Sequence, residues 1–237
     1  MARLRQQNAP LWLFDLDNTL HDASHAIFPV IKDNMNAFLA QVLAANGAPA
    51  TPDAVNAVRL DYWRRYGATL LGMVRHHQVR PEHFLREAHQ FDDLSALIRA
   101  ERGLVDLLKR LPGRKILLTN APLDYSRQVV RQLGLQRHFA RHISIESMRV
   151  HGRLRPKPAP QLLRQLLARE RITASRCVLV EDTLSHLKVA KALGLRTVWV
   201  TGYLPGRPPR PRLRCAPYVD VKIKSVRQLS GNLHRLR

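Results

Sequence analysis

Residues 11–20 read Leu11-Trp12-Leu13-Phe14-Asp15-Leu16-Asp17-Asn18-Thr19-Leu20. The apolar residues predict a buried strand over Leu11–Leu16, and this strand ends at two carboxylates spaced i, i+2. In an open α/β sheet, ligands bind outside the carboxyl ends of the strands. Paired acids at such a strand end indicate a metal-assisted site, and the rest of the chain must show which chemistry it performs.

The composition is that of a globular protein. Of the 237 residues, 45% are hydrophobic and 24% are charged, which suffices for a substantial core. No apolar run approaches the roughly 18 residues of a membrane-spanning helix, and the first residues lack the pattern of a signal peptide. The two cysteines, Cys177 and Cys215, are too few for a disulfide framework. We therefore expect a cytoplasmic protein that does not enter a membrane.

The formal net charge of +21 is extreme. It has two interpretations: a surface that binds the phosphates of nucleic acid, or a generally arginine-rich surface without a dedicated partner. The basic residues are spread along the chain and are dense only over Arg207–Arg214. No signature of a nucleic-acid-binding fold accompanies them, so we favour the second interpretation. Under either one, the positive charge attracts anionic phosphate substrates.

Strand patterns alternate with helix patterns over much of the chain. The predicted strands are Leu11–Leu16, Lys115–Thr119, His142–Glu146, Cys177–Glu181, Thr197–Val200 and Tyr218–Ile223. The predicted helices between the later strands are Asp124–Leu133, Pro160–Glu170 and Ser185–Leu193. This alternation predicts βαβ units, and hence an α/β domain with a Rossmann-like, mostly parallel sheet flanked by helices.

Residues 21–110 interrupt the alternation. They show helix patterns over Ile31–Ala45, Pro52–Tyr66, Pro81–Gln90 and Leu94–Leu111, and no convincing strand. We therefore expect a core domain of residues 1–20 and 111–237 with an inserted all-helical cap of residues 21–110. An insertion after the first strand would lie over the active face, either as a lid or as a packed decoration. The Pro- and Arg-rich stretch Tyr203–Pro217 predicts an exposed loop.

Four short motifs fall at or just after predicted strand ends: Asp15-x-Asp17-x-Thr19, Leu117-Leu118-Thr119-Asn120, Pro156-Lys157-Pro158 and Val180-Glu181-Asp182. Each motif alone is common in turns and caps. Their order over nearly the whole chain resembles that of the haloacid dehalogenase superfamily of phosphohydrolases. The Asp-Asn-Thr-Leu ending of the first motif, Tyr66-Gly67 with Leu70, Thr119-Asn120-Ala121 and Arg155-Pro156-Lys157-Pro158 resemble, more narrowly, its pyrimidine 5′-nucleotidase branch.

The resemblance implies three catalytic residues. Asp15 would be the nucleophile that forms an aspartyl-phosphate. Asp17 would protonate the leaving alkoxide and then deprotonate the hydrolytic water, while Thr19 would support the loop. Lys157 would offset the repulsion between carboxylate and phosphate, which is about 4 kcal/mol per charge pair at 4 Å and intermediate dielectric.

The resemblance also implies a phosphate-binding pair and a Mg²⁺ site. Thr119 and the backbone N–H of Asn120 would bind a phosphoryl oxygen. Mg²⁺, which prefers hard oxygen ligands and phosphate substrates, would be held by Asp15, the backbone carbonyl of Asp17, and Asp182.

Three histidines need separate interpretation. Many members of the superfamily carry a second acid four positions after the equivalent of Asp182, and here that position is His186. Support for the metal is then altered or shared with Glu181, since imidazole suits softer metals than Mg²⁺. His21 and His25 follow the first motif directly, so they are either surface residues or part of the pocket mouth.

The expected function is a Mg²⁺-dependent phosphomonoester hydrolase that acts on a small phosphorylated substrate, a pyrimidine nucleoside 5′-monophosphate by resemblance. The alternatives are a sugar-phosphate or phosphoglycolate phosphatase of the same superfamily, and a basic nucleic-acid-binding module with a degenerate site. The intact Asp15, Asp17, Lys157 and Asp182 argue against degeneracy. Dehalogenation is disfavoured because that chemistry does not need Asp17. The sequence makes no prediction of oligomeric state.

Overall fold

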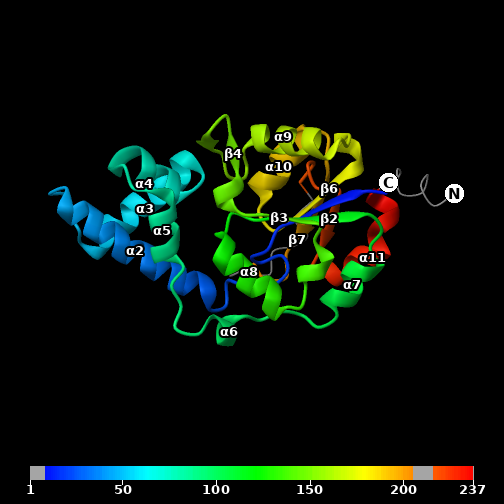
Figure 1. The fold of residues 1–237 in the computed structure, drawn as a ribbon, viewed down its shortest axis with the longest axis horizontal. Coiled ribbons are helices and arrows are strands. Elements are labelled where there is room, and N and C mark those ends of the chain that lie inside the picture. The colour runs from blue at the N-terminus through cyan, green and yellow to red at the C-terminus, as the bar shows by residue number, and fades with distance from the viewer. Residues whose placement is uncertain (1–8, 205–215, 237) are drawn as a thin grey trace. The chain divides into compact units, whose positions relative to one another are not determined.

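The computed structural model describes residues 9–204 and 216–236. The chain divides into two compact units, which we call the sheet unit, Met1–Ser24 with Ile98–Arg237, and the helical unit, His25–Leu97 (Figure 1). The helical unit is shorter than the expected insertion of residues 21–110, because residues 21–24 and 98–110 belong to the sheet unit. No described helix is long and apolar enough to cross a bilayer.

The sheet unit is built on a six-stranded sheet in the order β3-β2-β1-β6-β7-β8. Each neighbouring pair of strands in this sheet is parallel. The strands are β1 (Leu11–Phe14), β2 (Arg114–Leu118), β3 (Arg141–Ile143), β6 (Cys177–Glu181), β7 (Arg196–Val200) and β8 (Val221–Ile223). Each one overlaps a strand predicted from the sequence, so the expected Rossmann-like α/β fold is confirmed.

Helices cover both faces of this sheet. Figure 1 shows α9 (Pro160–Glu170) on one side of the strands and α7 (Leu104–Arg110) and α8 (Leu123–Gln132) on the other. Leu11 and Leu13 of β1 share a core cluster with residues of α9 and α10 (Leu184–Ala192). Trp12 and Phe14 alternate to the opposite face. Because both faces are covered, all four residues of β1 are apolar and buried.

The register of β1 positions the motifs. Phe14 pairs with Leu117 of β2 on one side and with Val180 of β6 on the other. The backbone N–H of Asp15 extends the register by donating to the Val180 carbonyl at 3.0 Å. Three strands therefore end at one edge of the sheet, and the first, second and fourth motifs follow there directly.

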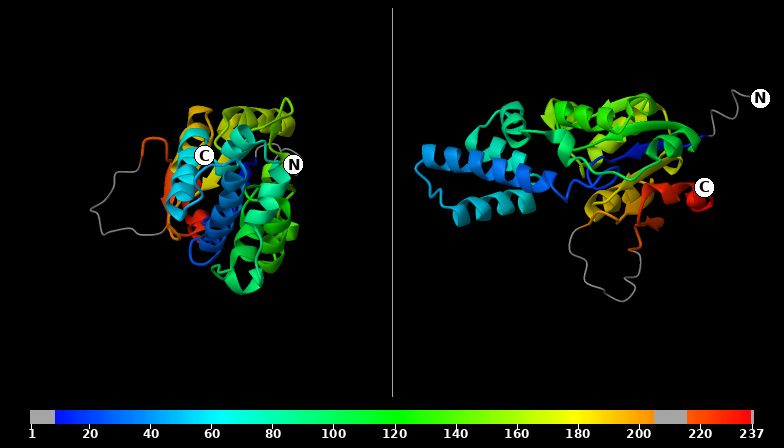
Figure 2. Two further views of the ribbon diagram at one scale, coloured as in Figure 1. Left: turned by 90° about the vertical axis from the view of Figure 1, so that its left-hand side faces the viewer. Right: turned by 90° about the horizontal axis from the view of Figure 1, so that it is seen from below.

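The helical unit contains α2 (Ile27–Ala45), α3 (Pro52–Tyr66), α4 (Thr69–His77), α5 (Pro81–Ala88) and α6 (Leu94–Leu97). Figure 2 shows α2 and α3 running side by side. Gly67 ends α3 in the left-handed conformation, at φ 79°. Gly72 of α4 allows a close contact with α3, because a Cβ there would lie 2.1 Å from Cγ of Tyr62.

The prediction of one helix over Leu94–Leu111 is wrong. The chain forms α6 and α7 with a non-helical stretch between them, and Gly103 precedes α7 at φ 86°. A left-handed residue cannot continue a right-handed helix, so no single helix can run through Gly103. Helix α4 was not predicted, because its nine residues are bounded by no strong cap.

Shorter elements complete the sheet unit. An antiparallel hairpin of β4 (Arg149–Val150) and β5 (Arg153–Leu154) precedes the third motif, and α11 (Leu229–Asn232) lies near the end of the chain. The 3₁₀ segments are Gln136–His138, Ile145–Ser147, Ala174–Arg176, Val226–Gln228 and Leu233–Leu236. The predicted loop at Tyr203–Pro217 falls mostly outside the described residues.

Candidate active site

Asp15 lies at the carboxyl end of β1 and is 4% exposed. Its Oδ1 accepts a hydrogen bond from Lys157 Nζ at 2.6 Å, and its Oδ2 accepts one from the Thr19 hydroxyl at 3.0 Å. Burial, followed by the negative charge of Glu181, raises the pKa of Asp15 to about 6. Both oxygens of this carboxylate are thus oriented by donors from different segments of the chain.

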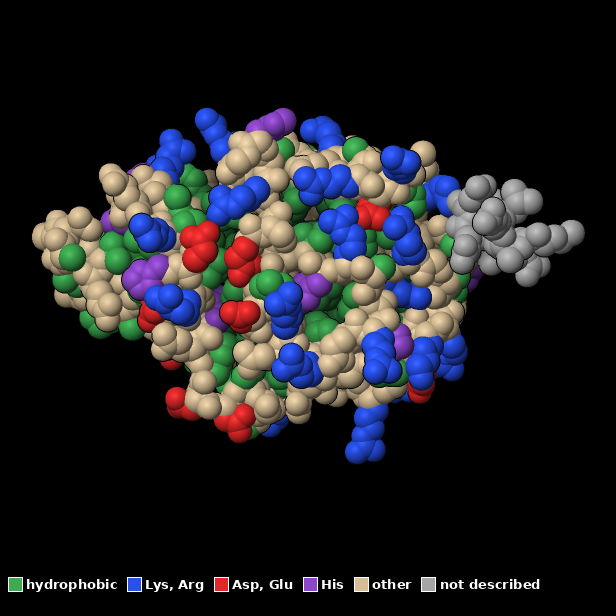
Figure 3. Space-filling view, viewed as in Figure 1, with side chains coloured by type: hydrophobic (Ala, Val, Ile, Leu, Met, Phe, Trp, Pro, Cys, Tyr) green, Lys and Arg blue, Asp and Glu red, His purple; other side chains and the backbone are tan. Residues whose placement is uncertain are grey.

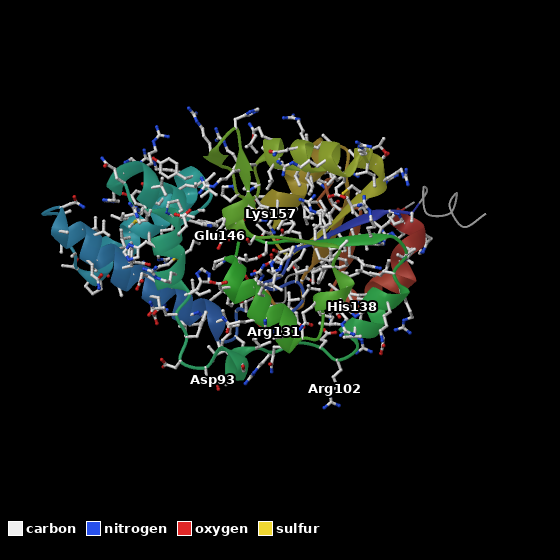
Figure 4. The ribbon with its side chains drawn as sticks, viewed as in Figure 1. Asp93, Arg102, Arg131, His138, Glu146 and Lys157 are labelled. Carbon is white, nitrogen blue, oxygen red and sulfur yellow. The ribbon has the colours of Figure 1, made fainter. Side chains whose placement is uncertain are left out.

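Lys157 brings the third motif to the same place (Figure 4). Its ammonium contacts Asp15 and also Glu181 Oε2, at 2.8 Å. Burial alone would lower the pKa of Lys157, but the two carboxylates outweigh it and hold that pKa above its ordinary value. Asn120 fixes the Lys157 backbone: its side chain accepts from the Lys157 N–H at 2.9 Å and donates to the Lys157 carbonyl at 3.0 Å.

Glu181, the last residue of β6, completes a cluster of three carboxylates. Each of the three residues contributes one carboxylate oxygen, and these oxygens lie within 4.8 Å of one another; the residues are Asp15, Glu181 and Asp182. Burial would raise the pKa of Glu181, but Lys157 and His186 hold it well below its usual range. Burial, and then the charges of Glu181 and Asp15, raise the pKa of Asp182 to about 9. His186 Nδ1 lies 3.0 Å from Glu181 Oε2.

The cluster fits a hard divalent cation. Its donors are all carboxylate oxygens, which are the ligands that Mg²⁺ prefers. Lys157 alone does not balance the negative charge of three carboxylates. Burial, and then the charges of the neighbouring carboxylates, raise the pKa values of Asp15 and Asp182. Asp15, Glu181 and Asp182 could therefore hold such an ion. When bound, it would neutralise the carboxylates and polarise a phosphoryl group.

Asp17 points to different partners. Its Oδ1 lies 2.8 Å from His21 Nε2 and accepts a hydrogen bond from the Tyr125 hydroxyl at 2.6 Å. His21 is completely buried, so it is neither a surface residue nor at a pocket mouth. His25, by contrast, is an exposed residue at the start of the helical unit.

Thr119 and Asn120 follow β2 at the same sheet edge. Thr119 is 1% exposed, and its hydroxyl accepts from the Ala121 N–H at 3.1 Å, which closes a tight turn after the strand. The Asn120 side chain is engaged with the Lys157 backbone, as described above. Through this pairing the second and third motifs hold each other in place.

The structure thus brings Asp15, Lys157 and Asp182 together, with Asn120 supporting Lys157. Of two further neighbours in the site, Glu181 was expected only as possible shared support for the metal, and Tyr125 was not predicted at all. Glu181 carries a recognisable signal, because an acid inside a buried apolar strand needs a charged partner. Tyr125 carries none, since it lies 108 residues from Asp17 on a helix with an ordinary amphipathic pattern.

Comparisons with known proteins bear on the family and the fold. The sequence model of the haloacid dehalogenase-like hydrolases matches residues 11–194. The fold resembles a HAD phosphatase from Thermococcus onnurineus, with a TM-score of 0.61, 18% identity, and coverage of 94% of this chain and 97% of that one. It also resembles a 2-haloacid dehalogenase from Pseudomonas syringae, with a TM-score of 0.58, 22% identity, and coverage of 97% and 100%. The chain belongs to the haloacid dehalogenase-like hydrolase family.

Proposed function

We propose that this hydrolase cleaves phosphate monoesters with the help of Mg²⁺, through an aspartyl-phosphate on Asp15. The observation that carries the proposal is the buried contact of Asp15 with Lys157, 2.6 Å long, beside two further carboxylates. A nucleophilic carboxylate can approach an anionic phosphate only where positive charge offsets their repulsion. Lys157 and a cation held by the three carboxylates would supply that charge.

The reaction would proceed in two displacements. In the first, an oxygen of Asp15 bonds to phosphorus, the bond from phosphorus to the ester oxygen breaks, and Asp17 gives its proton to that oxygen. In the second, Asp17 takes a proton from water, the water oxygen bonds to phosphorus, and the bond to Asp15 breaks. Inorganic phosphate leaves, and both aspartates return to their starting states.

The presence of Asp17 favours phosphate ester hydrolysis over dehalogenation. Displacement of halide from carbon needs a nucleophilic carboxylate and a halide site, but no acid two residues further on. An alkoxide leaving group is strongly basic, and its departure needs a proton donor. Asp17 is present and is held by two buried side chains, which supports phosphate ester hydrolysis.

As the preferred substrates we propose pyrimidine nucleoside 5′-monophosphates. The support is the resemblance of Asp17-Asn18-Thr19-Leu20, Thr119-Asn120-Ala121 and Arg155-Pro156-Lys157-Pro158 to that branch of the superfamily. The helical unit remains a candidate cap.

A phosphatase screen with Mg²⁺ tests class and substrate together. Nucleoside monophosphates and sugar phosphates are compared at equal concentration by phosphate release, and we expect the pyrimidine nucleotides to give the highest kcat/KM. EDTA should stop turnover and added Mg²⁺ should restore it. The variant Asp15→Asn should lose at least about 1,000-fold in kcat while keeping its circular dichroism spectrum.

Three outcomes would contradict parts of this proposal. A preference for sugar phosphates would contradict the assignment of nucleotides as substrates, but the protein would still be a phosphate monoester hydrolase. Appreciable turnover by Asp15→Asn would remove the nucleophile. Submicromolar binding of an oligonucleotide at physiological salt, together with no hydrolysis of any phosphate ester, would favour a nucleic-acid-binding protein instead.

A further inference from the structure

Two buried side chains converge on a single oxygen of Asp17. The Tyr125 hydroxyl donates to Oδ1 at 2.6 Å, and His21 Nε2 lies 2.8 Å from the same atom. Tyr125 is 2% exposed and His21 is 0% exposed, whereas the Asp17 side chain retains 16% exposure. A carboxylate oxygen only accepts hydrogen bonds, so His21 Nε2 carries its hydrogen in this contact.

The segment that carries Tyr125 is anchored independently of Asp17. The first turn of α8 is held by Glu146 (Figure 4), whose carboxylate accepts from the Leu123 N–H at 2.9 Å. One residue after Tyr125, the Ser126 hydroxyl bonds to the Pro122 carbonyl at 2.8 Å and lies 2.8 Å from His142 Nε2. The backbone on both sides of Tyr125 is therefore held by contacts other than the one to Asp17.

The loop that carries His21 is held by hydrogen bonds between its two ends. Asn18, at φ 58°, donates from Nδ2 to the Ser24 hydroxyl at 2.8 Å and accepts from the Ser24 N–H at 3.0 Å. Asparagine tolerates this left-handed conformation better than most residues. These two hydrogen bonds between Asn18 and Ser24 restrain the turn between Asp17 and Ser24. His21 lies within that turn, so it also contacts Asp17 from a restrained backbone.

The Tyr125 hydroxyl is the donor in its 2.6 Å contact with Asp17, because a carboxylate oxygen can only accept. Two fixed donors on one oxygen restrict the rotation of the Asp17 carboxyl group more than either would alone.

We propose that Tyr125 and His21 are positioning residues that hold the Asp17 carboxyl group by Oδ1 in the orientation from which Asp17 gives its proton to the leaving group and later takes one from water. This inference rests on the proposed function, because it assigns a task to the general acid of that reaction. In the first displacement, the O–H bond of the Asp17 carboxyl group breaks as the new O–H bond on the departing alkoxide forms. In the second, the Asp17 carboxylate takes up a proton from the attacking water.

The leaving group provides the test. A nucleoside or alkyl phosphate releases a basic alkoxide and needs the proton, whereas p-nitrophenyl phosphate releases a stable phenolate and needs it little. The ratio kcat/KM covers only the steps up to departure of the leaving group, so it reports the acid and not the later base. A misplaced acid therefore affects kcat/KM for the alkyl ester selectively, while a general disturbance of the site affects both substrates.

The experiment compares Tyr125→Phe with the wild type on both substrates in the presence of Mg²⁺. This variant removes one oxygen and keeps the buried ring. We expect kcat/KM to fall about 10-fold or more for the alkyl ester and less than about 3-fold for p-nitrophenyl phosphate. Tyr218→Phe, in the same unit and half-buried, is the matched control and should change neither value.

His21 and Asp17 variants complete the test. His21→Gln keeps an N–H donor and should retain more activity on the alkyl ester than His21→Ala. In an Asp17→Asn background, Tyr125→Phe should have almost no further effect on the alkyl ester, because the group that it positions is already lost.

The inference is overturned if Tyr125→Phe lowers kcat/KM equally for both substrates, or if it raises activity on the alkyl ester, which would mean that the contact restrains Asp17 in an unreactive orientation. An equal loss in the wild-type and Asp17→Asn backgrounds would overturn it as well. If the wild type hydrolyses neither ester, the proposed function itself fails, and that result is distinct from each of these.

Discussion

The helical unit and the sheet unit differ completely in charge. Residues 25–97 contain seven Lys and Arg residues and seven Asp and Glu residues, so the helical unit is formally neutral and the whole net charge of +21 belongs to the sheet unit. Figure 3 shows Lys and Arg side chains spread over the visible surface, with few acids among them. The acidic cluster is thus set in a strongly positive unit, which favours the approach of anionic substrates.

The two units also differ in how their polar contacts are made. In the helical unit, Tyr62 lies 2.8 Å from His77, 15 residues away, and the Asn34 side chain donates to the Gln90 carbonyl across 56 residues. In the sheet unit, Lys157 reaches Asp15 across 142 residues. The candidate chemistry therefore depends on a contact that exists only once the sheet has formed.

The largest effect on stability should come from the centre of the sheet unit. Lys157→Met leaves Asp15 and Glu181 buried without their cation, and we expect a loss of about 3–5 kcal/mol in the free energy of unfolding. The readout is denaturant unfolding followed by tryptophan fluorescence in a Trp63→Phe background, where Trp12 and Trp199 report on the sheet unit alone. Lys188→Met, at an exposed position, should change stability by less than about 0.5 kcal/mol.

Mg²⁺ should stabilise one unit and not the other. At about 100 times its dissociation constant, a ligand that binds only the folded state adds about 2.7 kcal/mol. We expect this gain in the Trp12 and Trp199 signal of the Trp63→Phe protein, and a much smaller gain in Asp182→Asn. An equal gain in both proteins would place the ion elsewhere.

A third prediction addresses the helical unit. Gly72→Ala puts a methyl group 2.1 Å from the ring of Tyr62, so α3 and α4 must move apart, at a cost of about 1–3 kcal/mol. Far-ultraviolet circular dichroism should then show an earlier loss of helix, while the tryptophan transition of the sheet unit stays in place. Coincident shifts of both signals would show that the two units unfold together.

The smallest expected effect concerns the stability at low pH that Asp220 contributes, next to the edge strand β8. Burial would raise the pKa of Asp220, but Lys191 and hydrogen bonds from Thr197 hold it below its ordinary value. The ionised carboxyl group therefore stabilises the fold above the unfolded pKa of about 3.9, and this contribution is lost as the pH falls through the lower folded pKa. Asp220→Asn should lose less stability than the wild type between pH 6 and pH 3, whereas the exposed Asp106→Asn should follow the wild type.

Many elements of both units could be predicted from local pattern. The helices Pro52–Tyr66 and Pro160–Glu170 match their predicted bounds, since each begins at a proline and shows an apolar face. The prediction of a continuous helix failed at Gly103, where the backbone conformation of one residue interrupts the helix. The sequence does not show which glycine adopts a positive φ. The hairpin of β4 and β5 was missed because two-residue strands have no periodicity.

The sequence by itself determined the family, the strand-end placement of the four motifs, and the presence of Asp15, Asp17, Lys157 and Asp182. Periodicity and short-range spacing suffice for these, since each strand ends where its apolar run ends. Only the tertiary structure decided that Glu181 shares Lys157 with Asp15, and that Tyr125 and His21 meet on one oxygen of Asp17. Side-chain direction and packing set those contacts across up to 142 residues of chain, and no local pattern encodes them.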